Sequence, residues 1–240
     1  FVSGANPKSL LQSLNVGLET GKSELLKSDY LVLTFGTAHY YTHMKFQKIF
    51  SNCHKIPQIE FTKQRASTNQ ITDSWIPLIE QILKLNPNLK ILLSVSPVRY
   101  LKDGYVENQR SKASLLLAAE YLSQHCSCLE YFPAYEIFMD DLRDYRYVEE
   151  DLVHPNKIAI DYIWSYFEKA YYNETTLHYK QQLEKFRALA EHRILSTESN
   201  SFKSYVEQLS RQFEELHKKY PQADFNFEAQ QIEKLKNLLI

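Results

Sequence analysis

Apolar residues gather in three short runs within the first two thirds of the chain. The runs lie in Tyr30–Phe35, Lys90–Ser96 and Leu129–Phe132. A short apolar run that ends at glycine, proline or a loop is typical of a strand buried on both faces of a parallel sheet. We therefore predict a strand at each of these three positions.

Around these runs, apolar residues recur at steps of three and four, which is the period of an amphipathic helix. The predicted helices cover Ser9–Leu26, Thr72–Leu85, Asn108–Gln124 and, after Pro155, Ile158–Tyr172. Strands that alternate with helices indicate βαβ units and a parallel sheet. Because three strands are few for such a sheet, we expect one or more strands at its N-terminal side to be missing from this chain.

The pattern becomes entirely helical at Leu177. From there on, leucine and aromatic residues repeat at steps of three and four, with a break at Pro221. We predict a sheet domain at residues 1–176 and a helical extension at residues 177–240. The extension is expected to pack on the sheet domain or on a second copy of the chain, which would make the protein an oligomer.

The charge balance excludes several classes of partner. The chain has 28 Lys and Arg residues against 29 Asp and Glu residues, and no block of five or six like charges. This composition argues against nucleic acid as a partner and against a polybasic membrane anchor. The apolar runs are also far shorter than the roughly 20 residues that span a bilayer. We predict no membrane span.

The glycine and cysteine content bears on which cofactors the protein can bind and on the compartment it works in. Five scattered glycines cannot form a glycine-rich phosphate loop, and we predict no cofactor. The three cysteines do not suggest a disulfide framework, which favours a reducing compartment such as the cytoplasm. The chain begins at Phe1 rather than at Met, so the sequence leaves its natural start, and with it the localisation, open.

Zinc-ligand residue types occur close together at His39, His43, Cys53 and His54. His39 and His43 follow a strand rather than lying on a recognisable helix. The adjacent Cys53 and His54 are poorly placed to share one tetrahedral ion. We therefore predict no metal site.

Open parallel sheets bind ligands beyond the carboxyl ends of their strands, and three polar loops qualify here: residues 36–39, 96–99 and 151–155. In the last, Asp151 can accept a hydrogen bond from Nδ1 of His154. That contact would fix the tautomer and leave Nε2 as a general base for a nucleophile, ordinarily a serine on another loop. The alternative is a capping carboxylate beside an ordinary surface histidine, which is the commoner origin of so short a motif in isolation.

Longer motifs favour a functional role for Asp151 and His154. They occur in a fixed order at Leu33–Ala38, Ser51–Lys55, Ser94–Arg99, Leu101–Gly104, Asn108–Lys112, Phe132–Glu136, Asp141–Arg146 and Asp151–Pro155. Through them the chain, from Asp29 to about Phe167, resembles the GSCFA family, a group of bacterial proteins in the SGNH (GDSL-like) hydrolase clan.

The resemblance implies a three-layer α/β/α fold with an SGNH-like (flavodoxin-like) parallel sheet and a serine ester hydrolase or acyl-transfer site. In the clan, an Asp-x-x-His near the C-terminus supplies the orienting acid and the base, which correspond to Asp151 and His154. The Gly-Ser-Cys-Phe-Ala segment that carries the family's serine does not occur in these 240 residues. We expect the nucleophile to lie upstream of this chain.

The clan's Gly-x-Asn-Asp motif corresponds to residues 36–39, where Ala38 replaces the asparagine of the oxyanion hole. We expect oxyanion support from Asn52, or from backbone N–H groups near Gly36 and Thr37. Asn52 can equally be a turn-forming residue.

His54 and Arg99 are candidate contacts for an anionic or sugar substrate, although Arg99 can equally be an ion-paired surface arginine. The predicted function is hydrolysis or transfer of an ester-linked acyl group on a carbohydrate or another small polar substrate. The alternative is a non-catalytic ligand-binding or assembly protein on the same fold.

Overall fold

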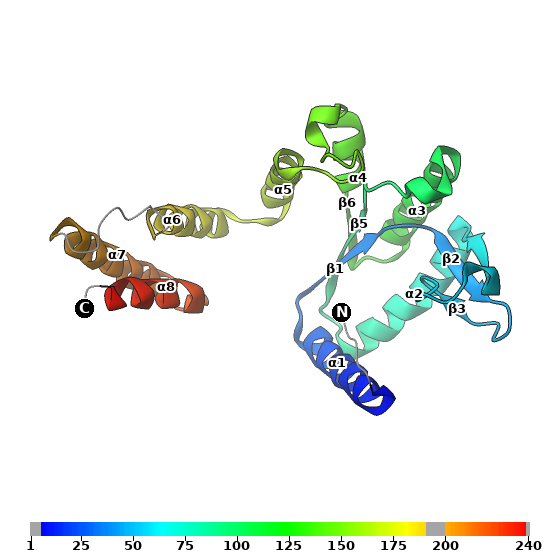
Figure 1. Ribbon diagram of the computed structural model, residues 1–240, viewed down its shortest axis with the longest axis horizontal. Coiled ribbons are helices and arrows are strands. Elements are labelled where there is room, and N and C mark those ends of the chain that lie inside the picture. Colours follow the sequence, from blue (N-terminus) through cyan, green and yellow to red (C-terminus); the bar gives the residue numbers. More distant parts are fainter. Residues whose placement is uncertain (1–5, 191–199, 239–240) are drawn as a thin grey trace. The chain divides into compact units, whose positions relative to one another are not determined.

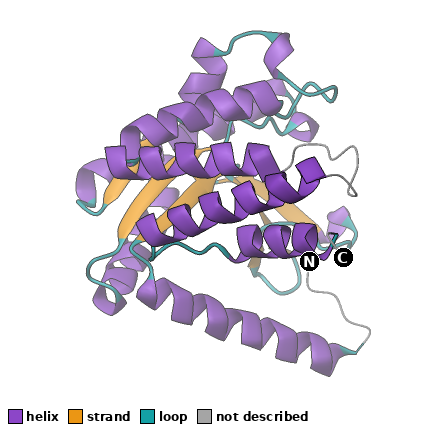
Figure 2. Cartoon of the chain, turned by 90° about the vertical axis from the view of Figure 1, so that its left-hand side faces the viewer, coloured by secondary structure: helices purple, strands orange, loops and turns teal. Residues whose placement is uncertain are grey.

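A computed structural model of the chain describes residues 6–190 and 200–238. The chain divides into two compact units, Phe1–Trp164 and Ser165–Ile240. Helices make up most of it, as the purple ribbons of Figure 2 show. No helix among the described residues is long and apolar enough to cross a membrane.

The first unit is built on a parallel sheet of three strands, β1 (Tyr30–Phe35), β5 (Lys90–Val95) and β6 (Leu129–Phe132), in the order β1-β5-β6 (Figure 1). Leu31 pairs with Ile91, which in turn pairs with Leu129. All three predicted strands are confirmed, and so is the α/β class with a parallel sheet and C-terminal helices. The expected burial on both faces holds for β5 but is wrong for β1, where Tyr30 and Val32 are more than half exposed.

One face of this sheet packs against α2 (Thr68–Leu85) and α3 (Tyr105–His125). Ile91 and Leu93 point to that side and are completely buried. The helix α2 begins at a capping box, in which the side chains of Ser67 and Gln70 each bond the other residue's backbone N–H. The core therefore fixes the carboxyl ends of β1 and β5 relative to α3.

A second sheet, which the sequence pattern did not predict, follows β1. It is antiparallel and contains β2 (His39–His43), β3 (Ile49–Phe50) and β4 (Phe61–Arg65) in the order β3-β2-β4. These strands are only two to five residues long. They mix aromatic with charged residues, so no apolar run marks them.

Short helical turns connect the remaining elements of the first unit. They are η1 (Gln58–Glu60), η2 (Leu101–Asp103), α4 (Ala134–Glu136), a π-helical turn η3 (Ile137–Asp141) and η4 (Tyr145–Tyr147). Two longer helices, α1 (Pro7–Lys27) and α5 (Lys157–Tyr171), match the predicted positions within a few residues. The segment from α4 to α5 follows β6 and carries Asp151 and His154.

The second unit contains α6 (Glu174–Ala190), α7 (Asn200–Lys219) and α8 (Asn226–Asn237). Its core gathers Phe186, Leu209 and Ile232, one from each helix. The buried Glu228 accepts a hydrogen bond of 2.7 Å from Nε of Arg187. Residues 191–199 and 239–240 of the predicted helical extension lie outside the described residues.

Candidate active site

The segment that carries Asp151 and His154 is a tight loop between η4 and α5. Val148 and Pro155 face each other in an isolated antiparallel bridge that closes the loop. Inside it, the N–H of Glu149 donates to the carbonyl of His154 at 2.8 Å. The backbone thus holds the loop shut, and the side chains of Asp151 and His154 project from it half exposed.

Asp151 bonds His154 in the way the spacing predicts. Its Oδ2 lies 2.6 Å from Nδ1 of the imidazole, while its Oδ1 accepts the backbone N–H groups of Val153 at 2.8 Å and His154 at 3.0 Å. These contacts, chiefly the backbone and side-chain bonds from His154, lower the pKa of Asp151 to about 2.

The ionised Asp151 acts only as an acceptor, so Nδ1 of His154 carries the proton. Its Nε2 has no hydrogen-bond partner within the described part of the chain. An imidazole held in this tautomer can take a proton through Nε2, which is the geometry that a general base requires. The catalytic role of the pair stays a prediction.

Arg99, at the carboxyl end of β5, reaches this loop from 53 residues away: its guanidinium donates to the carbonyl of Leu152. Leu152 has a φ of +58°, in the left-handed region that residues other than glycine seldom adopt. Arg99 therefore holds the backbone between Asp151 and His154 in an unfavourable conformation. The sequence suggested a substrate contact for Arg99, and the structure adds this loop contact.

Gly36, a predicted site residue at the end of β1, accepts a hydrogen bond from a buried lysine. The ammonium group of Lys112, whose residue is 1% exposed, donates to the carbonyl of Gly36 at 2.7 Å and also to that of Ser96. Burial lowers the pKa of Lys112 to about 8. One side chain thereby joins the ends of β1 and β5, the two strands whose loops were expected to form the site.

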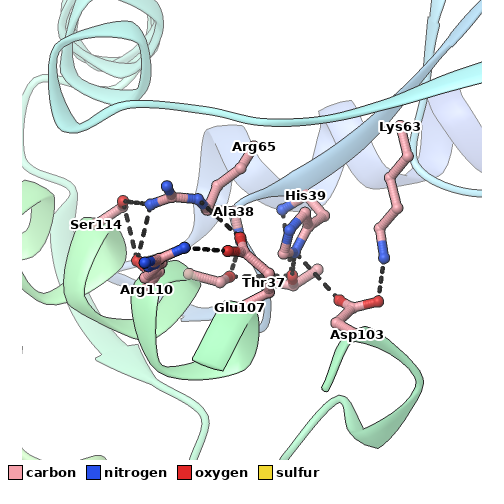
Figure 3. Close-up of polar contacts among 10 residues, drawn as sticks. Thr37, Ala38, His39, Lys63, Arg65, Asp103, Glu107, Arg110 and Ser114 are labelled. Carbon is pink, nitrogen blue, oxygen red and sulfur yellow. Dashed lines mark hydrogen bonds and ion pairs between the residues drawn. The ribbon is translucent and has the colours of Figure 1, made fainter. Parts of the chain in front are cut away.

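Thr37 and the residues after it belong to a polar network at the end of β1 (Figure 3). The hydroxyl of Thr37 lies 3.2 Å from that of Ser111, and the N–H of Ala38 donates to the Ser111 hydroxyl at 2.8 Å. The N–H of His39 donates back to Thr37 at 3.2 Å. The backbone donors of Ala38 and His39 are thus already used inside the protein.

Farther along Figure 3, Nδ1 of His39 lies 3.2 Å from Oδ2 of Asp103, whose other oxygen pairs with Lys63. Burial lowers the pKa of His39 although the Asp103 carboxylate opposes this. Burial therefore favours the neutral ring, whose Nδ1 also lies 3.3 Å from the hydroxyl oxygen of Thr37. Together these residues fasten the antiparallel sheet to η2.

Asn52 and His54 lie in the loop between β3 and η1, which belongs to the antiparallel sheet. Oδ1 of Asn52 accepts the backbone N–H of His54 at 2.8 Å, which is the arrangement of a turn-forming asparagine. No contact between described residues joins this loop to Asp151 or His154. The described residues also contain no group of three His, Cys, Asp or Glu side chains placed to hold a metal ion.

Sequence reasoning assigned no role to Lys112, Asp103 or Ser111, although all three lie in the motifs that carry the family resemblance. Asp103 lies in η2, whereas Ser111 and Lys112 lie on α3, where their burial could have been suspected only from polar residues that recur on the inner face of the helix. The amphipathic pattern of α3 is weak because Asn108, Ser111 and Lys112 occupy buried positions.

The model of the GSCFA family matches residues 2–167 of this chain. Neither the curated proteins nor the solved structures contain a match. The matched region includes both sheets of the first unit, the polar network around Lys112 and the Asp151–His154 loop.

Proposed function

Because the chain belongs to the GSCFA family, with its hydrolase-like domain, we propose that it is a serine-type ester hydrolase or acyltransferase with His154 as general base. The hydrogen bond of 2.6 Å between Nδ1 of His154 and Oδ2 of Asp151 carries this proposal. It orients the ring, fixes its tautomer and stabilises the imidazolium that forms during the reaction.

In this mechanism, Nε2 of His154 removes the proton of a serine hydroxyl as the serine oxygen attacks the ester carbonyl carbon. The tetrahedral intermediate collapses to an acyl-serine when the imidazolium returns the proton to the departing alcohol oxygen. Water or a second alcohol then attacks the acyl-serine with His154 again as base, and the imidazolium returns the proton to the serine oxygen as it leaves, which releases the acid or the new ester. The serine that we expect is that of the family's Gly-Ser-Cys-Phe-Ala segment.

The oxyanion of that intermediate needs donors. Ala38 and His39 contribute none, since their N–H groups bond Ser111 and Thr37. We assign the role to the backbone N–H groups of Gly36 and Thr37. The amide of Asn52 is the remaining candidate, and it would have to act from the loop of the antiparallel sheet.

The test is turnover of a small aryl ester by the complete translation product, in which His154→Ala should lower kcat/KM about 100-fold or more. Asp151→Asn separates two roles of that residue, because Asn keeps an acceptor for the backbone N–H groups of Val153 and His154 but can donate to Nδ1. It should lower kcat and leave thermal stability nearly unchanged.

The matched control is His125→Ala, which removes an exposed histidine at the end of α3. It should leave turnover unchanged. Wild-type activity in the folded His154→Ala variant would remove His154 from the mechanism.

A second function, ligand binding or assembly without turnover, is favoured by one observation. Ala38 replaces the oxyanion asparagine and its own N–H is occupied by Ser111. Under this alternative the folded wild-type protein hydrolyses no aryl ester, and deletion of residues 177–240 changes its sedimentation.

A further inference from the structure

An open pocket of about 220 Å³ lies beside the Asp151–His154 loop. Its walls come from three segments: the loop after β5, the π-helical turn η3 and the chain around η4. Apolar side chains form most of its surface, namely Phe138, Met139, Leu142, Tyr145 and Val148, and charged side chains from Arg99, Arg143 and Asp144 complete it. Phe138 and Leu142 are buried and form its base, whereas Tyr145 is 69% exposed at its edge.

The pocket and the Asp151–His154 pair share two structural elements. Val148 lines the pocket, and its backbone bridges to Pro155, the neighbour of His154. Arg99 also lines the pocket, and its guanidinium bonds the carbonyl of Leu152. The pocket therefore adjoins the backbone of the loop that carries His154.

We propose that this pocket binds the acyl chain of the substrate, a proposal that rests on the proposed function. A pocket with an apolar floor next to a general base suits an ester whose acyl tail is buried while its carbonyl group remains near His154. Arg99 lies on the wall next to the loop and can contact a polar oxygen at the head of such a chain.

The volume sets the chain length. A water molecule occupies about 30 Å³, and a methylene group is of similar size, so the pocket holds roughly six or seven carbons. Each methylene that enters should raise affinity about fourfold. The gain should stop once the chain outgrows the pocket.

Binding can be measured without turnover by ¹⁹F NMR, using hexanoate with a terminal trifluoromethyl group as the probe and trifluoroacetate as the short control. The intact wild-type chain should broaden the signal of the hexanoate probe and leave that of trifluoroacetate sharp. Equal broadening of both signals, or of neither, would overturn the proposal.

The two methionines supply matched variants. Met139→Glu places a carboxylate in the pocket and should weaken binding of the probe tenfold or more, whereas Met44→Glu changes a half-exposed methionine of the antiparallel region and should not. If circular dichroism shows that Met139→Glu does not fold, Tyr145→Ala replaces it and should weaken binding by removing the exposed wall. Unchanged binding in a folded pocket variant would overturn the proposal.

The pocket and the proposed function can fail separately. Probe binding without ester turnover would retain the pocket and reject the hydrolase. Turnover that requires His154, in a protein that does not bind the hexanoate probe, would reject the pocket and retain the hydrolase.

Discussion

The buried ammonium group of Lys112 should leave a measurable trace in the pH dependence of stability. Its pKa is about 8 in the folded protein, against an ordinary value of 10.5. That difference corresponds to a cost of about 3 kcal/mol for keeping the charge at neutral pH. The unfolded chain binds more protons than the folded chain between these two pKa values, so this contribution to stability rises with pH across that window.

The contribution of Lys112 to the free energy of unfolding can be calculated over a pH range that unfolding experiments can reach. Between pH 7 and pH 9, Lys112 should add about 1 kcal/mol to the free energy of unfolding, since most of its folded-state proton is released there. The thiols of Cys126 and Cys128 act in the opposite direction near pH 9, because burial raises their pKa values in the folded protein. A comparison with Lys112→Met cancels this opposing contribution.

Urea unfolding followed by tryptophan fluorescence is the appropriate assay, since Trp75 and Trp164 both belong to the first unit. The wild-type free energy of unfolding should gain about 1 kcal/mol more than that of Lys112→Met between pH 7 and pH 9. Parallel pH profiles of the two proteins would refute the reasoning, because they would mean that Lys112 titrates as an exposed lysine does.

Two further predictions concern local backbone structure. Ser67→Ala removes one half of the capping box of α2 and should lower the free energy of unfolding by about 1 kcal/mol, measured by urea unfolding. An unchanged free energy of unfolding would mean that the cap contributes nothing. Leu152→Gly relieves a φ of +58° and should leave stability unchanged or raise it by up to about 1 kcal/mol. A clear loss of stability in that variant would show that the Leu152 side chain, rather than its backbone, supports the loop.

The parallel sheet could be predicted from the sequence because its strands are continuous apolar runs, although only β5 is buried on both faces and β1 exposes Tyr30 and Val32. The antiparallel sheet left no such run. In β2, a His-Tyr-Tyr-Thr-His segment presents polar and aromatic groups on both sides. Its pairing with β4 depends on residues about 20 positions away, which local periodicity does not report.

The same division applies to the candidate site. The contact between Asp151 and His154 spans three residues, so their spacing alone predicts it. The contact of Arg99 with Leu152 spans 53 residues, and it exists only because the loop after β5 meets the loop before α5. Lys112 illustrates a second limit, since a lysine on a helix is ordinarily exposed and only tertiary structure reveals its burial.

Fluorophosphonate labelling with peptide mapping tests the central claim most directly, because such probes react with an activated serine. It should be carried out on this chain and on the complete translation product, each as wild type and as His154→Ala. The account predicts that one serine is labelled in the wild-type complete product and that labelling disappears in its His154→Ala variant. A folded complete product that is not labelled, or one labelled equally without His154, would contradict the account.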